Sequence, residues 1–267
     1  STILDELNAF VPELVLQLKR STEWNYYNKP YNENWCKNIN TLKKNYPYKY
    51  KKTKDDTFKT QDVLSELNKH IKYQSDNLIF TSGVGNHQMM ATQYIKWKYP
   101  NRFISSGSLG VMGTGLPYAI GAQIANPDKI VVDIDGDSSF NMTSTDLKTI
   151  VEHDLPIKIL ILNNNTQDMV RVWETLFFDE RITATTNKIN PDFTKLARSY
   201  GLKALKCEKM KDLEECIDLF KKAQGPILLE CKVKPDVCLP LVAPGKALDE
   251  MLLYNDEFQM LQGECPS

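Results

Sequence analysis

The sequence predicts an α/β fold, with a doubly wound, mostly parallel sheet that carries helices on both faces. Three observations point to it. From residue 77 onward, short β-rich runs alternate with longer helical patterns. The gaps between consecutive runs hold the dozen or more residues that a parallel crossover needs. Polar residues and glycines follow several runs, at the strand ends where such sheets bind their ligands.

The expected elements follow one another along the second part of the chain. Short apolar or β-branched runs predict strands at residues 78–81, 103–105, 130–134, 157–162, 202–205 and 226–233. Longer segments with apolar residues at helical spacing predict helices at residues 87–98, 116–124, 145–152, 166–177, 191–200 and 211–223. At least one helix lies between consecutive strands, which is the order that right-handed crossovers produce.

The chain is expected to have four parts. Residues 1–20 form a helix or the tail of a preceding domain, and residues 61–238 form the α/β domain. Residues 21–60 are rich in Asn, Lys, Tyr and Trp with little periodicity, which predicts a connector that is partly helical around 35–42. Residues 239–267 form a C-terminal tail or lid. The apolar stripe of the first part consists of Leu4, Leu7, Phe10, Val11, Leu14, Leu16 and Leu18.

Composition and charge exclude several classes of function. The 267 residues include 33 basic and 34 acidic side chains, so the net charge of -1 gives no reason to expect binding to nucleic acid or to an anionic membrane. The basic stretch at 43–54 is read as a solvated linker in preference to a binding patch. No apolar run approaches the roughly 20 residues that span a bilayer.

The six cysteines are scattered, without a CxxC pair or a histidine at ligand spacing. A zinc site is therefore not expected. A disulfide framework is not expected in so large a chain either, so we expect reduced thiols in an intracellular compartment.

Two polar groups follow consecutive strands. Asp137 comes after the run that ends in Asp135-Gly136, and Asn164 comes after the next run of the predicted sheet. Parallel strands bring their carboxyl ends to one edge, so the two side chains are expected to converge there. Carboxylate and amide oxygens suit Mg²⁺, which also binds phosphate oxygens. Each feature alone has an ordinary explanation, a helix N-terminal acid for Asp137 and a turn for Asn163-Asn164.

The pattern of Gly136-Asp137 followed by Asn163-Asn164 resembles that of thiamine-diphosphate enzymes. The segments at 103–117 and 162–173 are similar to the catalytic subunits of acetohydroxyacid synthases (acetolactate synthases), particularly fungal forms. The resemblance extends from about residue 21 to the segment at 239–251. It implies that residues 61–238 are the pyrophosphate-binding domain of such an enzyme.

The resemblance also implies residue roles. Mg²⁺ would be held by Asp137, Asn164 and the backbone carbonyl of Thr166. Met112, which would support the bent cofactor, and Trp173, which with Val170 would shape the pocket for the second 2-keto acid, are the expected catalytic residues. Thiamine diphosphate would be bound by Asn86, His87, Gly110, Met112, Gly136, Ser138, Ser139, Gln167, Asp168, Met169 and Val170.

The implied reaction decarboxylates pyruvate on thiamine diphosphate and condenses the product with pyruvate or 2-ketobutyrate, in the biosynthesis of branched-chain amino acids such as isoleucine and valine. FAD is a further implied cofactor, with most of its contacts outside this chain. A homodimer or higher oligomer, a regulatory subunit and a mitochondrial location are implied as well. The family's catalytic glutamate comes from an N-terminal portion that is absent from these residues, so the chain alone is expected to be inactive.

Ordinary packing is the competing interpretation for several of these residues. Met112 and Met169 would be core filler if they stood outside the matching motifs. Trp173 would be a packing anchor on a helix. The glycines near residue 110 do not have the spacing of a dinucleotide-binding loop.

Four positions differ from the family pattern. Ser138 replaces a glycine, and Asn86 replaces a glutamine that is longer by one methylene. Asp168 replaces a glycine and brings a carboxylate near the diphosphate. Arg171 replaces a small polar residue, and an Asp168–Arg171 pair at helical spacing would offset that charge. Asp168, Arg171 and the missing N-terminal portion leave one alternative open, a degenerate paralogue that serves as a binding partner. A further alternative is another thiamine-dependent 2-keto acid decarboxylase with split subunits, and the residues around Met169, Val170 and Trp173 and the segment at 240–250 speak against it.

Overall fold

The computed structural model describes residues 2–20, 22–70, 76–97, 99–254 and 260–262. The chain divides into two compact units, Ser1–Tyr48 and Lys49–Ser267. Among the helices of the described residues, none is long and apolar enough to cross a bilayer.

The first unit consists of two helices, α1 (Thr2–Arg20) and α2 (Thr22–Asn45). The helix expected at 1–20 is present. The helix expected only around 35–42 is much longer, because α2 runs through most of the predicted connector. Apolar side chains of α1 remain accessible to solvent, with Phe10 60% and Val11 47% exposed.

The second unit is built on a six-stranded sheet in which every pairing is parallel. The strand order is β2-β1-β3-β4-β6-β5, so the winding direction reverses between β1 and β3. In a doubly wound sheet this is the place where a ligand crevice forms. The strands are β1 (Leu78–Ser82), β2 (Phe103–Ser105), β3 (Ile130–Gly136), β4 (Lys158–Asn163), β5 (Lys203–Cys207) and β6 (Ile227–Lys232).

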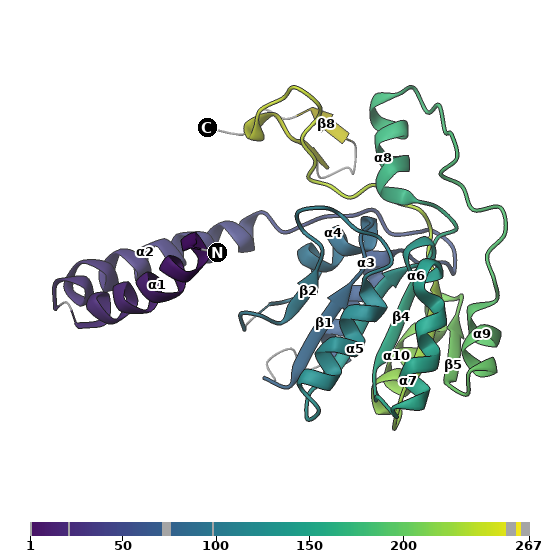
Figure 1. Ribbon diagram of the computed structural model, residues 1–267. Helices are drawn as coiled ribbons and strands as arrows, with labels where there is room; N and C mark the ends of the chain where they lie inside the picture. The colour runs from purple at the N-terminus through teal and green to yellow at the C-terminus, as the bar shows by residue number, and fades with distance from the viewer. Residues whose placement is uncertain (1, 21, 71–75, 98, 255–259, 263–267) are drawn as a thin grey trace. The chain divides into compact units, whose positions relative to one another are not determined.

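Helices cover both faces of the sheet, as predicted (Figure 1). One apolar core joins the sheet to α3 (Thr60–His70), α4 (Asn86–Tyr94) and α10 (Leu213–Lys222). The other core joins it to α5 (Gly115–Ala125), α6 (Asp137–Thr143), α7 (Leu147–Glu152) and α9 (Phe193–Ser199). Burial of apolar side chains on two faces explains why the strands are apolar nearly throughout. Short 3-10 turns lie at η1 (Ser144–Asp146), η2 (Met210–Asp212) and η3 (Leu248–Glu250).

The remaining elements lie at the carboxyl edge of the sheet. Helix α8 (Asp168–Phe177) stands above this edge, and the antiparallel pair β7 (Leu252–Tyr254) and β8 (Met260–Gln262) lies on the same side (Figure 1). The edge is therefore flanked by segments that approach it from outside the sheet.

The predicted elements match the observed ones closely, and the differences have physical causes. Strand β3 continues beyond the expected 130–134, because Asp135 and Gly136 pair with Ile161 and Leu162 of β4. The helix expected at 87–98 is shorter, since α4 ends at Tyr94, and residue 98 lies outside the described residues. Helices α3 and α6 were not predicted. The division at 61–238 and 239–267 stays a prediction.

Candidate functional site

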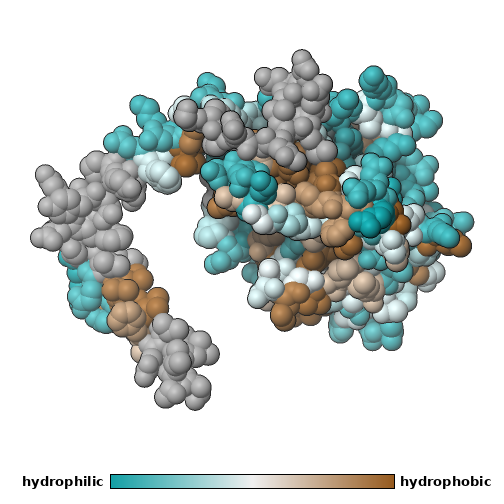
Figure 2. Space-filling view, turned by 90° about the horizontal axis from the view of Figure 1, so that it is seen from above, coloured by the Kyte–Doolittle hydropathy of each residue, from teal (hydrophilic) through white to brown (hydrophobic). Residues whose placement is uncertain are grey.

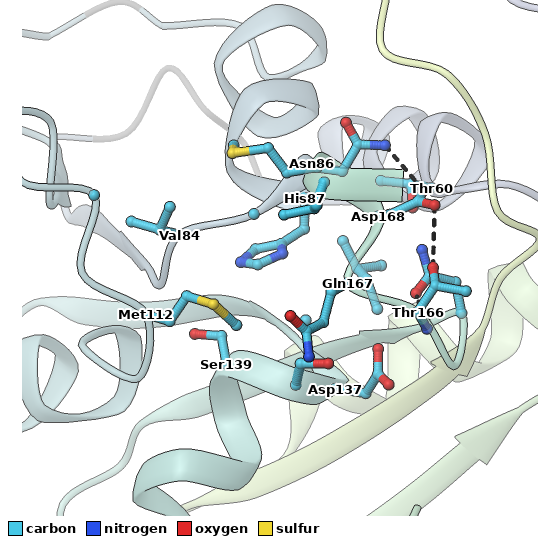
Figure 3. Close-up of a pocket in the computed structure, with 18 residues that line it drawn as sticks. Thr60, Val84, Asn86, His87, Met112, Asp137, Ser139, Thr166, Gln167 and Asp168 are labelled. Atoms are coloured by element: carbon cyan, nitrogen blue, oxygen red, sulfur yellow. Dashed lines mark hydrogen bonds between the residues drawn. The ribbon is translucent and has the colours of Figure 1, made fainter. Parts of the chain in front are cut away.

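A cavity of about 210 Å³ opens at the reversal point of the sheet, above the carboxyl ends of β1, β3 and β4. Apolar residues gather at the centre of this face in the view from above (Figure 2). Nearly all predicted site residues line the cavity, and Figure 3 shows how those it labels face one another across it. They are Asn86, His87, Gly110, Met112, Gly136, Asp137, Ser138, Ser139, Asn164, Thr166, Gln167, Asp168, Met169 and Val170.

Asp137 is placed by the transition from β3 to α6, since the strand ends at Gly136 and the helix begins with this acid. Its side chain is buried, with 1% exposure. Burial raises the pKa of Asp137, while hydrogen bonds from the side-chain amides of Asn190 and Asn187 and from the backbone N–H of Asn164 oppose that shift. The carboxylate therefore has fixed donors around it and lies against the Asn164 segment, as the proposed cation site requires.

The loop between β4 and α8 supplies the other oxygen donors. The backbone N–H of Thr166 donates to Asn164 Oδ1 at 3.0 Å, which makes a tight turn. Asn165 has a positive φ of 58°, a conformation that asparagine tolerates better than most residues. The turn brings the Asn164 side-chain oxygen and the Thr166 backbone carbonyl to the wall that holds Asp137. This set of hard oxygen donors fits Mg²⁺.

The cavity also has the features of an anion site. The N-termini of α4 and α8 both border it, through Asn86 and Asp168. Neither helix has a side-chain hydrogen bond at its N-cap, which is Gly85 in α4 and Gln167 in α8. Backbone N–H groups at such helix ends favour phosphate groups. The donor set and the helix ends therefore fit a diphosphate with its cation.

Asp168 has partners that differ from the expected one. Its Oδ2 accepts from Asn86 Nδ2 at 3.0 Å and from the backbone N–H of Asp236 at 3.3 Å, and its Oδ1 accepts from Thr166 Oγ1 at 3.0 Å. Burial raises the pKa of Asp168, and these hydrogen bonds oppose the shift. The expected ion pair with Arg171 does not form, because the guanidinium donates to Thr186 Oγ1 instead.

A buried histidine and acid pair supports the floor of the cavity. His87 Nε2 lies 3.2 Å from the Gly83 carbonyl oxygen and 3.2 Å from Asp135 Oδ1. Because both neighbours are acceptors, Nε2 carries the ring proton. Asp133 accepts from Thr81 Oγ1 at 3.0 Å, and burial, followed by the charge of Asp135, raises its pKa well above the ordinary value.

Trp173 is the one predicted site residue that does not line the cavity. It lies on α8, where its ring packs against Phe177 with centroids 5.2 Å apart, and it is 38% exposed. Its catalytic role stays a prediction.

The cavity is also lined by Thr60, Val84, Gly85 and Leu162, which were not predicted. Thr60 comes from a helix start far from the recognised motifs, whereas the other three lie within two positions of a predicted residue.

The comparisons with known proteins agree with this geometry. Residues 83–231 match the family model described as thiamine pyrophosphate enzyme, C-terminal TPP binding domain. The chain is 46% identical over 232 residues to the mitochondrial acetolactate synthase catalytic subunit of Saccharomyces cerevisiae. That alignment covers 86% of this chain and 34% of the relative. It is 43% identical over 223 residues to the mitochondrial acetolactate synthase of Schizosaccharomyces pombe, with 83% and 33% covered.

A more distant relative is the acetolactate synthase large subunit of Cyanidium caldarium, which is 36% identical over 252 residues, with 94% of this chain and 42% of the relative covered. The chain thus spans about a third of the length of the two fungal relatives.

Proposed function

Because this chain belongs to the thiamine pyrophosphate enzymes and contains their C-terminal TPP binding domain, we propose that it forms the diphosphate-binding and Mg²⁺-binding part of an acetolactate synthase catalytic subunit. The observation that carries the proposal is the convergence of Asp137 and the Asn164–Thr166 turn on one wall of the cavity. The cavity combines these hard oxygen donors with the ends of helices α4 and α8, whose N-caps have no side-chain hydrogen bond.

Three groups would hold the cation: the Asp137 carboxylate, the Asn164 side-chain oxygen and the Thr166 carbonyl. The diphosphate would lie against the first turns of α4 and α8, beside His87 and Ser138. Ser138 is a modest departure from the family pattern, since its hydroxyl both donates and accepts. These residues bind and orient the cofactor, which supplies the carbanion chemistry when it is bound.

Apolar side chains would form the substrate side of the cavity. Met112 and Met169 line it, and Val170 is 53% exposed to solvent. Trp173 is one helical turn beyond Val170 on α8. We propose that Val170 and Trp173 contact the second 2-keto acid, pyruvate or 2-ketobutyrate, while Met112 supports the cofactor rings.

The small volume of the cavity supports a site that this chain shares with another portion of the protein. A volume of about 210 Å³ is below the roughly 300–1,000 Å³ of common small-molecule pockets, so this chain would supply one wall only. An N-terminal catalytic portion, from the same subunit or from a second copy, would supply the rest. FAD and a regulatory subunit would bind largely outside these residues. The names of both fungal relatives include the mitochondrion, and we propose the same location here.

The test is to supply the missing part. The chain is fused to the N-terminal portion of the Saccharomyces cerevisiae relative, and acetolactate formed from pyruvate is measured with thiamine diphosphate, Mg²⁺ and FAD. We expect product from the fusion and none from its Asp137→Ala variant. Asp128→Ala, at an exposed position away from the cavity, is the matched control. A fusion that binds thiamine diphosphate without forming acetolactate would overturn the enzymatic proposal in favour of a degenerate binding partner.

A further inference from the structure

The segment between α8 and α9 runs along the loop that follows β4. We call residues 183–190 the strap. The backbone N–H of Gln167 donates to the Thr185 carbonyl at 2.8 Å, and the backbone N–H of Asn187 donates to the Asn165 carbonyl at 2.8 Å. The strap thus pairs with the loop in a short antiparallel arrangement. This pairing brings strap side chains to Asp137, although they are 50 residues or more away in the sequence.

Two amides of the strap bind the same oxygen of Asp137. Asn190 Nδ2 donates to Oδ2 at 2.7 Å, and Asn187 Nδ2 donates to it at 2.9 Å. Asn187 Nδ2 also lies 2.7 Å from Ser138 Oγ. Hydrogen bonds to a carboxylate are directional and strong, so two donors on one oxygen fix the rotation of the group. A carboxylate must lose this freedom before it can bind a cation.

Asn190 also connects the ends of the two central strands. Besides Asp137, its Nδ2 lies 3.0 Å from Asn165 Oδ1 and 3.3 Å from Asn163 Oδ1. Asn163 is fixed in turn, since its Nδ2 donates to the buried carboxylate of Glu230 at 2.7 Å. One amide group therefore sets the spacing between the carboxylate after β3 and the turn after β4.

The strap is anchored at its C-terminal end. Pro191 restricts the backbone of Asn190 to extended conformations. Two residues later, Phe193 is fully buried and packs edge-on against Phe140, with ring centroids 5.5 Å apart at 83°. Phe140 belongs to α6, the helix that begins with Asp137. Asn190 and Asp137 thus belong to two segments that are held together by the packing of Phe193 against Phe140.

From this geometry we infer that Asn187 and Asn190 are positioning residues of the cation site. They contribute no ligand atom; they hold Asp137 in the orientation, and at the distance from Asn164, that Mg²⁺ requires. The inference rests on the proposed function and extends it to a segment outside the recognised motifs. Mg²⁺ demands near-ideal octahedral geometry, whereas Ca²⁺ accepts flexible sites. Loss of the strap amides therefore weakens binding of Mg²⁺ more than binding of Ca²⁺.

The experiment uses the fusion to the N-terminal portion of the Saccharomyces cerevisiae relative, with excess thiamine diphosphate present, and titrates it with Mg²⁺ or with Ca²⁺ by calorimetry. The variants are Asn190→Ala, Asn187→Ala and Asp137→Ala, with Lys188→Ala as the matched control, because Lys188 is an exposed residue of the same strap. We expect each asparagine variant to lose about 10-fold or more in Mg²⁺ affinity. Losses of this size are typical when a group that hydrogen-bonds to a metal ligand is removed. Ca²⁺ affinity falls less, and Lys188→Ala resembles the unmodified fusion.

The outcomes separate this inference from the proposed function. Unchanged Mg²⁺ affinity in both asparagine variants, with loss in Asp137→Ala, overturns the positioning role alone. An equal loss for Mg²⁺ and Ca²⁺ that parallels a lower melting temperature in EDTA assigns the asparagines to general stability and also overturns it. Absence of Mg²⁺ binding in the unmodified fusion overturns the proposed function and this inference with it.

Discussion

Asn86 and Asp168 are hydrogen-bonded to each other at the edge of the cavity, with Nδ2 and Oδ2 3.0 Å apart. Both side chains are buried, with 4% and 7% exposure. The same amide donates to the backbone carbonyl of Asp236, whose N–H donates to Asp168. Two of the four departures from the family pattern, Asn86 and Asp168, therefore form one unit, which ties α4 and α8 to the segment after β6. Asp168 accepts three hydrogen bonds here, and Arg171 acts on it through its charge without forming an ion pair.

The Asn86–Asp168 unit predicts a measurable coupling. Asp168→Ala removes the acceptor of the Thr166 hydroxyl and of the Asp236 N–H, and one of the two acceptors of the Asn86 amide, so we expect a loss of about 2 kcal/mol in the free energy of unfolding. Urea denaturation of Asp168→Ala, Asn86→Ala and the double variant should show a coupling of about 1 kcal/mol. Strictly additive losses would show that the two side chains act independently.

Gly83 predicts a steric limit beneath the cavity. A Cβ atom there would lie 2.0 Å from Ser139 Oγ and 2.6 Å from Asp135 Oδ1, and Ser139 is itself fixed by the backbone N–H of Gly113. We expect Gly83→Ala to lower the free energy of unfolding by about 2 kcal/mol, as in other overpacked sites.

The matched control is Gly121→Ala, since a Cβ at this position of α5 meets nothing within 4 Å. Alanine is favoured over glycine in a helix, so this variant should gain up to about 1 kcal/mol. A similar effect of both substitutions in urea denaturation would contradict the steric argument.

The inner strands β1, β3, β4 and β6 were predictable because they are mostly apolar and are buried along nearly their whole length. The edge strands β2 and β5 are more exposed, and their short β-rich runs predicted them. What the sequence did not show is long-range. The end of β3 depends on pairing of Asp135 and Gly136 with β4. Helix α3 was not predicted because its buried face includes polar residues such as Gln61 and Glu66. Tertiary contacts bury them, so this face has no clear apolar pattern in the sequence.

The candidate site was predictable to the extent that its residues lie beside the strands. Asp137 and Asn164 follow consecutive strands, so the geometry of a parallel sheet brings them together. Asn187 and Asn190 follow no strand and carry no motif. Only the path of the strap takes them to Asp137, and the sequence holds no local signal of that path.

Buried acids predict a stability that falls with rising pH. The folded-state pKa of Asp133 is raised, so the folded chain holds this proton more tightly than the unfolded chain. The stability this confers is present below the unfolded pKa and is lost as pH rises through the folded pKa. Melting temperatures in EDTA should therefore fall over this window, and less steeply in Asp133→Asn than in the exposed control Asp128→Asn. Equal slopes in the two variants would contradict the assignment to Asp133.

The most direct test of the central claim is calorimetric titration of the fusion protein with thiamine diphosphate, once in the presence of Mg²⁺ and once in the presence of EDTA. The account predicts binding that requires Mg²⁺ and is at least about 10-fold weaker in Asp137→Ala, because Asp137 is the only carboxylate among the proposed ligands and its loss should cost no less than the loss of an outer partner of a metal ligand. Binding of equal strength in EDTA, or in Asp137→Ala, would contradict the account.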